Sequence, residues 1–245
     1  SPHAEAVARL TIPLSKLLFT PKVIPKREWM RFGIASGNIV QYNALDPWVW
    51  LKDFKPDARI LDELGLDESR PIITFRTEES FAAYLLGKTS GISTIVPILK
   101  RIMKEERDLQ IVIVPRYEEQ IGALKQVFGR EAVVCESVID APSLLYHTTI
   151  FVGAGGTMST EAALLGTPTF SCYPGEPTLI EKYLVKRGLI IRERTLQETA
   201  DRIIDILSMD EAAKKAQVEK ARRLVEGFED PAKVIKEKIT RLSQT

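Results

Sequence analysis

The stretch from Ile150 to Pro174 constrains the fold of this 245-residue chain more than any other. It reads IFVGAGGTMSTEAALLGTPTFSCYP: a short apolar run, a glycine-rich turn, a helix-like segment from about Met158 to Leu165, and a second apolar run. Glycines at such a turn permit positive φ and let a ligand approach the backbone closely. The start of the next helix presents N–H groups and a partial positive charge. The pattern predicts a strand, turn, helix and strand with a phosphate site at the turn.

The same alternation continues on both sides of this stretch. Strands are predicted at 72–75, 111–114, 132–135, 150–152 and 189–191, and helices at 92–104, 118–128, 141–146, 179–186 and 196–207. Strands that alternate with helices indicate a parallel sheet with both faces covered. We therefore expect an α/β fold.

The rest of the chain divides around this regular part. Residues 1–46 hold two strands and two short helices, too little for an independent core, and are predicted to be the edge of a domain. Residues 47–56 are a predicted linker, whose Trp48 and Trp50 are expected to pack against a domain more readily than to bind a ligand. Residues 57–209 form the regular domain, and 210–245 are charged C-terminal helices, the last starting at Pro231.

Composition narrows the classes of partner. The 34 Lys and Arg residues nearly balance the 33 Asp and Glu residues, so charge gives no reason to expect nucleic acid. No apolar run is long enough for a transmembrane segment. Cys135 and Cys172 lie in apolar runs and are expected to be buried reduced thiols, which indicates a cytoplasmic protein. No cluster of His, Cys and acidic residues has metal-ligand spacing, so we expect no metal and no cofactor.

The glycine turn at Gly153, Gly155 and Gly156 is not a dinucleotide fingerprint. Met158 stands where the third glycine of that motif belongs, and the turn follows the fourth strand of its domain instead of the first. No Gly-Lys-Ser/Thr follows, so it is no P-loop either. What remains is phosphate capture by the turn and the helix start. The hydroxyls of Thr157 and Ser159 can add donors, although Thr157 can equally be a helix N-cap only.

Glu161 is the most informative acid in the stretch. With Thr157 as the N-cap, the acid of a capping box would stand at position 160, so Glu161 has no capping role in this register. A carboxylate about one turn beyond a phosphate site can accept hydrogen bonds from the two hydroxyls of a ribose. The alternative is a solvated acid that interacts with the helix dipole.

Arg76 and Arg116 are expected at the ends of the first two strands of the regular domain. In a parallel sheet both lie at the carboxyl edge, where ligands bind. A guanidinium there can hold a phosphate in bidentate fashion, or can form an ion pair with a nearby acid instead. Three residues of the loop after the first strand are possible sugar contacts: Glu78, Glu79 and Tyr84.

The sequence GAGGTMSTEAALLGTP, followed by SCYPG, resembles the nucleotide-sugar-binding signature of GT-B glycosyltransferases and of the similar non-hydrolysing UDP-N-acetylglucosamine 2-epimerases. The chain most closely resembles an uncharacterised, largely archaeal family of that fold. Further motifs carry this resemblance over nearly the whole chain: PHAEA near the start, YNALD at 42–46, RTEE at 76–79, PRYEE at 115–119 and EDP at 229–231. It implies a complete C-terminal Rossmann-like domain and a partial N-terminal one, of which residues 1–46 are the C-terminal part.

The resemblance also implies roles for single residues. The ribose falls to Glu161, the pyrophosphate to Gly155, Gly156 and Thr157, and the uracil to the backbone of Ile139, which can also be a plain buried loop residue. It implies a UDP-sugar-dependent glycosyltransferase with an unknown acceptor, and a homodimer is possible. A UDP-sugar 2-epimerase and a non-catalytic nucleotide-binding module are the alternatives. No catalytic residue is assigned, since family members carry a longer N-terminal half that usually supplies the base.

Overall fold

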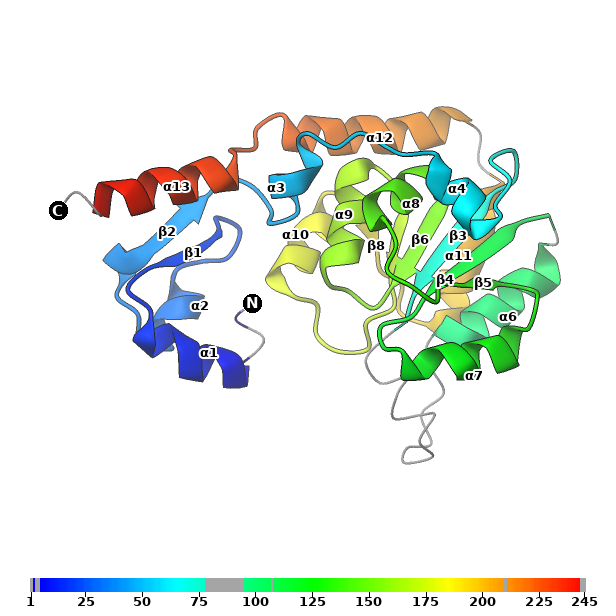
Figure 1. The fold of residues 1–245 in the computed structure, drawn as a ribbon, viewed down its shortest axis with the longest axis horizontal. Helices are drawn as coiled ribbons and strands as arrows, with labels where there is room; N and C mark the ends of the chain where they lie inside the picture. Colours follow the sequence, from blue (N-terminus) through cyan, green and yellow to red (C-terminus); the bar gives the residue numbers. More distant parts are fainter. Residues whose placement is uncertain (1, 3–4, 78–94, 107, 209–210, 243–245) are drawn as a thin grey trace.

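The computed structural model describes residues 2, 5–77, 95–106, 108–208 and 211–242. Its strands form two sheets, a two-stranded sheet β1-β2 near the N-terminus and a six-stranded sheet in the order β5-β4-β3-β6-β7-β8 (Figure 1). All described pairings are parallel. Within each sheet, the carboxyl ends of the strands therefore lie at the same edge, which is where α/β proteins bind ligands.

The six-stranded sheet has the standard doubly wound strand order. The chain starts in the middle at β3, builds outward through β4 and β5, and then crosses back to β6, β7 and β8. The order reverses between β3 and β6, which makes the gap beyond their carboxyl ends the topological switch point. The strands are β3 (Ile72–Arg76), β4 (Gln110–Val114), β5 (Val133–Val134), β6 (Ile150–Gly153), β7 (Thr169–Ser171) and β8 (Ile190–Ile191).

Helices cover both faces of this sheet (Figure 1). One face packs against α6 (Ile95–Glu105), α7 (Glu119–Phe128) and α11 (Leu196–Leu207), in a core that includes Phe75, Leu99 and Ile203. The other face packs against α4 (Arg59–Leu64), α8 (Ala141–His147) and α9 (Thr157–Leu165), while α10 (Leu179–Lys186) and α12 (Glu211–Val225) add a neighbouring cluster. The strands are apolar and buried almost throughout because both faces are covered.

The N-terminal elements form a small separate unit around β1 (Leu18–Pro21) and β2 (Ile39–Tyr42). Its core gathers Trp29, Phe32 and Ile39, and it includes contacts with Ile180 of α10. The remaining elements of the unit are α1 (Glu5–Thr11), a 3-10 turn (Ile12–Leu14), α2 (Arg27–Met30) and a second 3-10 turn (Ser36–Asn38). A short helix, α3 (Trp48–Leu51), lies within the predicted linker 47–56.

The C-terminal helices run back across the molecule to the linker (Figure 1). α12 packs against α9, and α13 (Pro231–Leu242) contacts α3. The segment between them is tied to the linker by an ion pair from Lys52 to Asp230 and by the edge-on contact of Trp48 with Phe228, whose ring centroids are 5.9 Å apart. Residues far apart in sequence thus hold α3 in place.

The predicted alternation of strands and helices is confirmed. Every predicted strand and helix named above has a counterpart in the structure, with bounds that differ by a few residues, and Pro231 is the first residue of the last helix. Residues 92–94 of the predicted helix 92–104 lie outside the described residues. None of the helices in the described ranges is both long and apolar enough to cross a membrane.

Candidate functional site

A cleft of about 950 Å³ opens at the switch point of the six-stranded sheet. Its walls come from the carboxyl ends of β3 and β4, the loop after β5 and the turn between β6 and α9. The cleft brings together eight of the residues singled out in the sequence: Arg76, Arg116, Ile139, Gly155, Gly156, Thr157, Met158 and Glu161. The predicted site residues are therefore neighbours in space although they come from four loops.

The turn between β6 and α9 depends on its glycines. Gly155 and Gly156 have φ of 80° and 90°, values that side-chain-bearing residues rarely adopt. Glycine is required at position 153 for a different reason: a Cβ there would lie 2.8 Å from the ring of Phe151. Two of the glycines thus shape the turn, while the first one allows β6 to pack.

The start of α9 corrects one sequence expectation. Gly156 is the N-cap, not Thr157, and no side chain caps the helix. The positive φ of Gly156 excludes threonine from that position, so Thr157 becomes the first helical residue, and its side chain is exposed. The first-turn N–H groups of α9 have no intrahelical acceptor and face the turn that lines the cleft. This helix start has the features that favour an anion, and the phosphate site stays a prediction.

Glu161 lies one turn further along α9 and is only 7% exposed. Its Oε1 accepts a hydrogen bond of 2.9 Å from Nε1 of Trp50, which no local sequence signal indicated. Burial raises the pKa of Glu161 above its ordinary value of 4.5, the Trp50 hydrogen bond lowers it, and the charge of Asp140 raises it. Glu161 is therefore not the solvated first-turn acid that the sequence left open.

Met158 and Ser159 are less exposed than Thr157, and Ser159 lines the smaller cavity beside the turn. Met158 is half-buried and packs against the core clusters beneath α8, although it also borders the cleft. Ser159 is 2% exposed, and no described residue forms a hydrogen bond with its Oγ. Neither Ser159 nor Gly153 lines the main cleft.

Arg76 supplies positive charge at the end of β3. Its Nη1 donates a 2.5 Å hydrogen bond to the carbonyl of Pro115, and no carboxylate among the described residues pairs with it. Burial, with the charge of Arg116 as a second cause, lowers the pKa of Arg76, yet a guanidinium stays charged at neutral pH. Arg116 follows β4 by two residues and is exposed, with its guanidinium 5.8 Å from the ring centroid of Tyr117.

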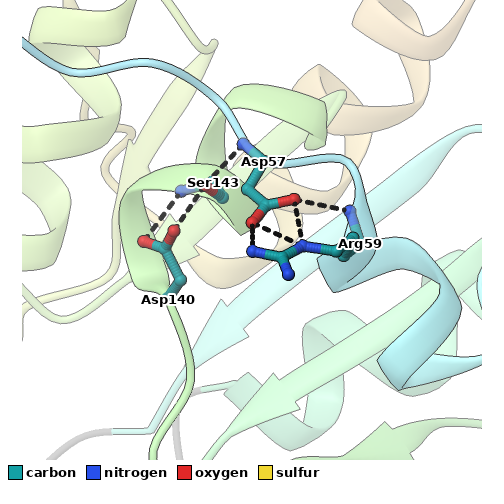
Figure 2. A network of polar contacts seen from close by, with 4 residues as sticks. All are labelled: Asp57, Arg59, Asp140 and Ser143. Carbon is teal, nitrogen blue, oxygen red and sulfur yellow. Dashed lines mark hydrogen bonds and ion pairs between the residues drawn. The ribbon is translucent and has the colours of Figure 1, made fainter.

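The loop that carries Ile139 is fixed by the hydrogen-bond network in Figure 2. Asp140 is the N-cap of α8 and accepts from the backbone N–H and the hydroxyl of Ser143, at 3.3 Å and 2.5 Å. The backbone N–H of Asp57 donates to the same hydroxyl at 3.0 Å. Arg59 pairs with Asp57, and its hydrogen bonds lower the pKa of that carboxyl to about 2. Ile139 is half-buried at the cleft wall, next to this network.

A second cavity, of about 370 Å³, lies behind the glycine turn. Gly155, Gly156 and Thr157 line both cavities, so the turn is their common wall. Glu181 of α10 lines the second cavity and is 5% exposed, but its Oε2 has no hydrogen-bond partner among the described residues. The sequence interpretation missed Glu181, because only the packing of α10 beside the turn gives it a place in the site.

Three predicted sugar contacts cannot be placed. Glu78, Glu79 and Tyr84 lie outside the described residues. Cys135 borders the main cleft as a buried thiol, and burial raises its pKa to about 11. Within the described ranges, no three His, Cys, Asp or Glu side chains gather as a metal-binding group.

The family described as "Protein of unknown function (DUF354)" matches residues 1–243. The chain belongs to the DUF354 family. An uncharacterised protein of Methanocaldococcus jannaschii is 32% identical over 210 residues, which are 84% of this chain and 59% of that relative. The predicted membership of an uncharacterised family is thereby confirmed, and the DUF354 chain spans about three fifths of this relative's length.

Solved structures place the DUF354 chain among GT-B and Rossmann-like proteins. The UDP-GlcNAc 2-epimerase of Neisseria meningitidis, bound to UDP-GlcNAc, aligns with a TM-score of 0.68 and 16% identity over 97% of this chain and 64% of that one. The Alr3699/HepE protein of Anabaena, in complex with UDP-glucose, aligns with a TM-score of 0.59 and 14% identity over 100% of this chain and 70% of that one. At such identities the likeness shows the fold, so the predicted α/β, GT-B-like class is confirmed. The division into two domains at 47–56 stays a prediction.

Proposed function

We propose that this DUF354 protein is a nucleotide-sugar-dependent enzyme, a UDP-sugar glycosyltransferase, that holds the nucleoside diphosphate in the cleft at the switch point. The observation that carries the proposal is the convergence there of an uncapped helix N-terminus, an arginine that pairs with no carboxylate among the described residues, and a buried carboxylate. The first two match the diphosphate of a nucleotide, and the carboxylate matches its ribose. The two structural neighbours described above were solved with UDP-GlcNAc and UDP-glucose, which supports UDP as the nucleotide.

The diphosphate fits the turn. N–H groups at the start of α9 and the helix dipole favour an anion over Gly155 and Gly156. Arg76 adds a full positive charge from the end of β3. In transfer, the bond between the sugar and the diphosphate breaks, and negative charge develops on the leaving oxygen. Fixed donors aimed at that charge stabilise the transition state, without any requirement for a metal ion in our proposal.

The nucleoside and the sugar extend to opposite sides of the turn. On the cleft side, Glu161 accepts from the ribose hydroxyls, and the backbone of Ile139 meets the base. On the other side, the second cavity offers the unpartnered Oε2 of Glu181 to a sugar hydroxyl. Glu78, Glu79 and Tyr84 remain predicted sugar contacts. The acceptor and the general base are not assigned.

Calorimetry with UDP tests the binding site. We expect Glu161→Ala to lower the affinity for UDP by about 10- to 100-fold, because a hydrogen bond to a charged group contributes about 1.5–3 kcal/mol. Glu63→Ala, an exposed acid on α4, is the matched control and should bind UDP like the wild type. Equal UDP affinity in the Glu161 variant would remove the ribose role, and no binding by the wild-type protein would remove the site.

A second experiment separates transfer from epimerisation. The full-length natural protein is incubated with UDP-N-acetylglucosamine alone and the sugar products are resolved. Transfer needs an acceptor, so we expect no turnover beyond slow hydrolysis. Formation of the 2-epimer would favour the epimerase alternative.

A further inference from the structure

Trp50 connects the linker with the predicted ribose site. It stands on α3, and its indole Nε1 lies 2.9 Å from Oε1 of Glu161, a residue 111 positions further along the chain. Among the described residues, this indole is the only hydrogen-bond donor to the Glu161 carboxylate. One oxygen of a buried carboxylate on α9 is thus held by a residue of α3, and Glu161 also lines the main cleft.

The chemistry of the pair favours a fixed orientation. An indole N–H only donates and does not titrate, so it always offers the same partner to a carboxylate oxygen. The bond fixes Oε1 of Glu161 and leaves Oε2 for a ligand. A free glutamate side chain at this position would sample several rotamers, each of which would have to be ordered when the ribose binds.

The helix that carries Trp50 is itself anchored. Leu51 is buried in the cluster beside α10, and Trp48 packs edge-on against Phe228. Lys52 forms an ion pair with Asp230 at the start of α13. Trp50 is 45% exposed, whereas Leu51 beside it is 6% exposed. Its neighbours on α3 fulfil the packing role, whereas Trp50 contributes its hydrogen bond.

We propose that Trp50 is a positioning residue, which holds Glu161 from the linker in the orientation that meets the two ribose hydroxyls of the nucleotide. The inference rests on the proposed function of Glu161. It makes the linker a part of the nucleotide site: a change in the position of α3 changes the affinity for ribose-containing ligands. Pyrophosphate, which has no ribose, is unaffected by the contact.

The groups around Glu161 set the expected pH dependence. Trp50 stabilises its charged form, whereas burial and the charge of Asp140 at the N-cap of α8 favour the neutral form; no cation is among the causes of its shift. Loss of the indole N–H therefore raises the pKa of Glu161 further. The ribose hydroxyls donate to the ionised carboxylate, so UDP affinity falls when Glu161 takes up a proton. As the pH is lowered, a variant without the indole donor should therefore lose UDP affinity at a higher pH than the wild type does.

The test uses Trp50→Phe, which keeps an aromatic ring but removes the donor. We expect this variant to bind UDP about tenfold more weakly, equivalent to about 1.4 kcal/mol. We also expect its UDP affinity to begin to fall at a higher pH than that of the wild type when the pH is lowered. Pyrophosphate should bind the variant and the wild type equally, which also shows that the variant is folded. Val49→Ala, at an exposed position of the same helix, is the control and should leave the UDP affinity and its pH profile unchanged.

A double-mutant cycle completes the test. If Trp50 acts through Glu161, Trp50→Phe has no further effect on UDP binding in a Glu161→Ala background. Equal UDP affinity and pH profiles for Trp50→Phe and the wild type would overturn this inference alone. A wild-type protein that binds pyrophosphate but gains nothing from the nucleoside would overturn the ribose role of Glu161 and this inference with it.

Discussion

Nη1 of Arg192 lies 2.8 Å from Oε1 of Glu181, and the hydroxyl of Ser171 donates to the same oxygen at 2.6 Å. Within the part of the chain that the structure describes, the other oxygen, Oε2, has no hydrogen-bond partner although the residue is buried. A Cβ added to Gly155 would lie 3.8 Å from Oε2, so this oxygen faces the glycine turn. A buried carboxylate with one satisfied oxygen and one unsatisfied oxygen is suited to a donor that arrives with a ligand.

Replacement of Glu181 should therefore separate the sugar from the nucleotide. We expect Glu181→Gln to weaken UDP-N-acetylglucosamine by about tenfold, since a hydrogen bond to a charged group contributes about 1.5–3 kcal/mol. The affinity for UDP itself should not change. Calorimetry with the two ligands measures both values, and Glu176→Gln, an exposed acid before α10, is the control. An equal loss for UDP and UDP-N-acetylglucosamine would place Glu181 outside the sugar subsite.

A second prediction concerns stability and pH. The pKa of Glu161 is raised in the folded protein, chiefly by burial, above its ordinary value of 4.5. The folded state therefore retains a proton that the unfolded state has lost, so this group makes stability fall as the pH rises from 4.5 through the folded pKa. Glu161→Gln removes the titration, and its amide oxygen can still accept from Trp50.

We expect Glu161→Gln to be more stable than the wild type at pH 7, with the difference vanishing below pH 4.5. For a chain of this size, each kcal/mol corresponds to about 2–4 °C in Tm. Thermal unfolding of both proteins across this pH range provides the measurement. A variant that is less stable at neutral pH would show that the ionised carboxylate stabilises the fold. The same substitution should lower the affinity for UDP. A variant that is more stable but binds UDP more weakly would show that Glu161 serves binding at a cost in stability.

The sequence predicted those parts of the site that depend on local rules. The glycine turn, the helix after it and the strand ends follow from apolar runs and from the conformational freedom of Gly155 and Gly156. Parallel strands end at the same edge of a sheet. Arg76 at the end of β3 and Glu161 on the helix after β6 could therefore be predicted to lie near one another. The prediction of Thr157 as the N-cap was wrong. Threonine is frequent at N-caps, but the N-cap here has the positive φ that Gly156 can adopt.

The contacts that complete the site could not be predicted in this way. Trp50 meets Glu161 across 111 positions, and Glu181 reaches the turn through the packing of α10. Both depend on how whole elements pack against one another, and neither position carries a local pattern. Trp50 lies between Pro47 and Pro56 in a segment that indicates a linker, but its indole N–H shows no preference in the sequence for any one acceptor.

A third prediction concerns the thiol at the cleft wall. Burial raises the pKa of Cys135 to about 11, and the nearby charge of Arg76 opposes this only in part. Since the thiolate is the nucleophile, about one thiol in a thousand is reactive at pH 8. In a Cys172→Ser background we expect iodoacetamide to label Cys135 slowly in the native protein and rapidly in urea. Labelling of the folded protein at the rate of an exposed thiol would show that the cleft wall opens.

The last prediction tests how α12 is held against α9. Gly166 ends α9 with φ of 84°, and a Cβ there would lie 2.6 Å from Cα of Val218 in α12. Gly166→Ala therefore adds backbone strain and a clash with main-chain atoms that cannot rotate away. We expect a loss of about 3 kcal/mol in the free energy of unfolding, measured by urea titration. Gly65→Ala is the matched control: Gly65 ends α4 with φ of 64°, and nothing lies within 4 Å of its added Cβ, so this variant measures the backbone strain alone. If both variants lose the same stability, α12 is not packed against the end of α9 in solution. If Gly166→Ala loses more than Gly65→Ala, the C-terminal helices contribute directly to the stability of the helix that carries Glu161.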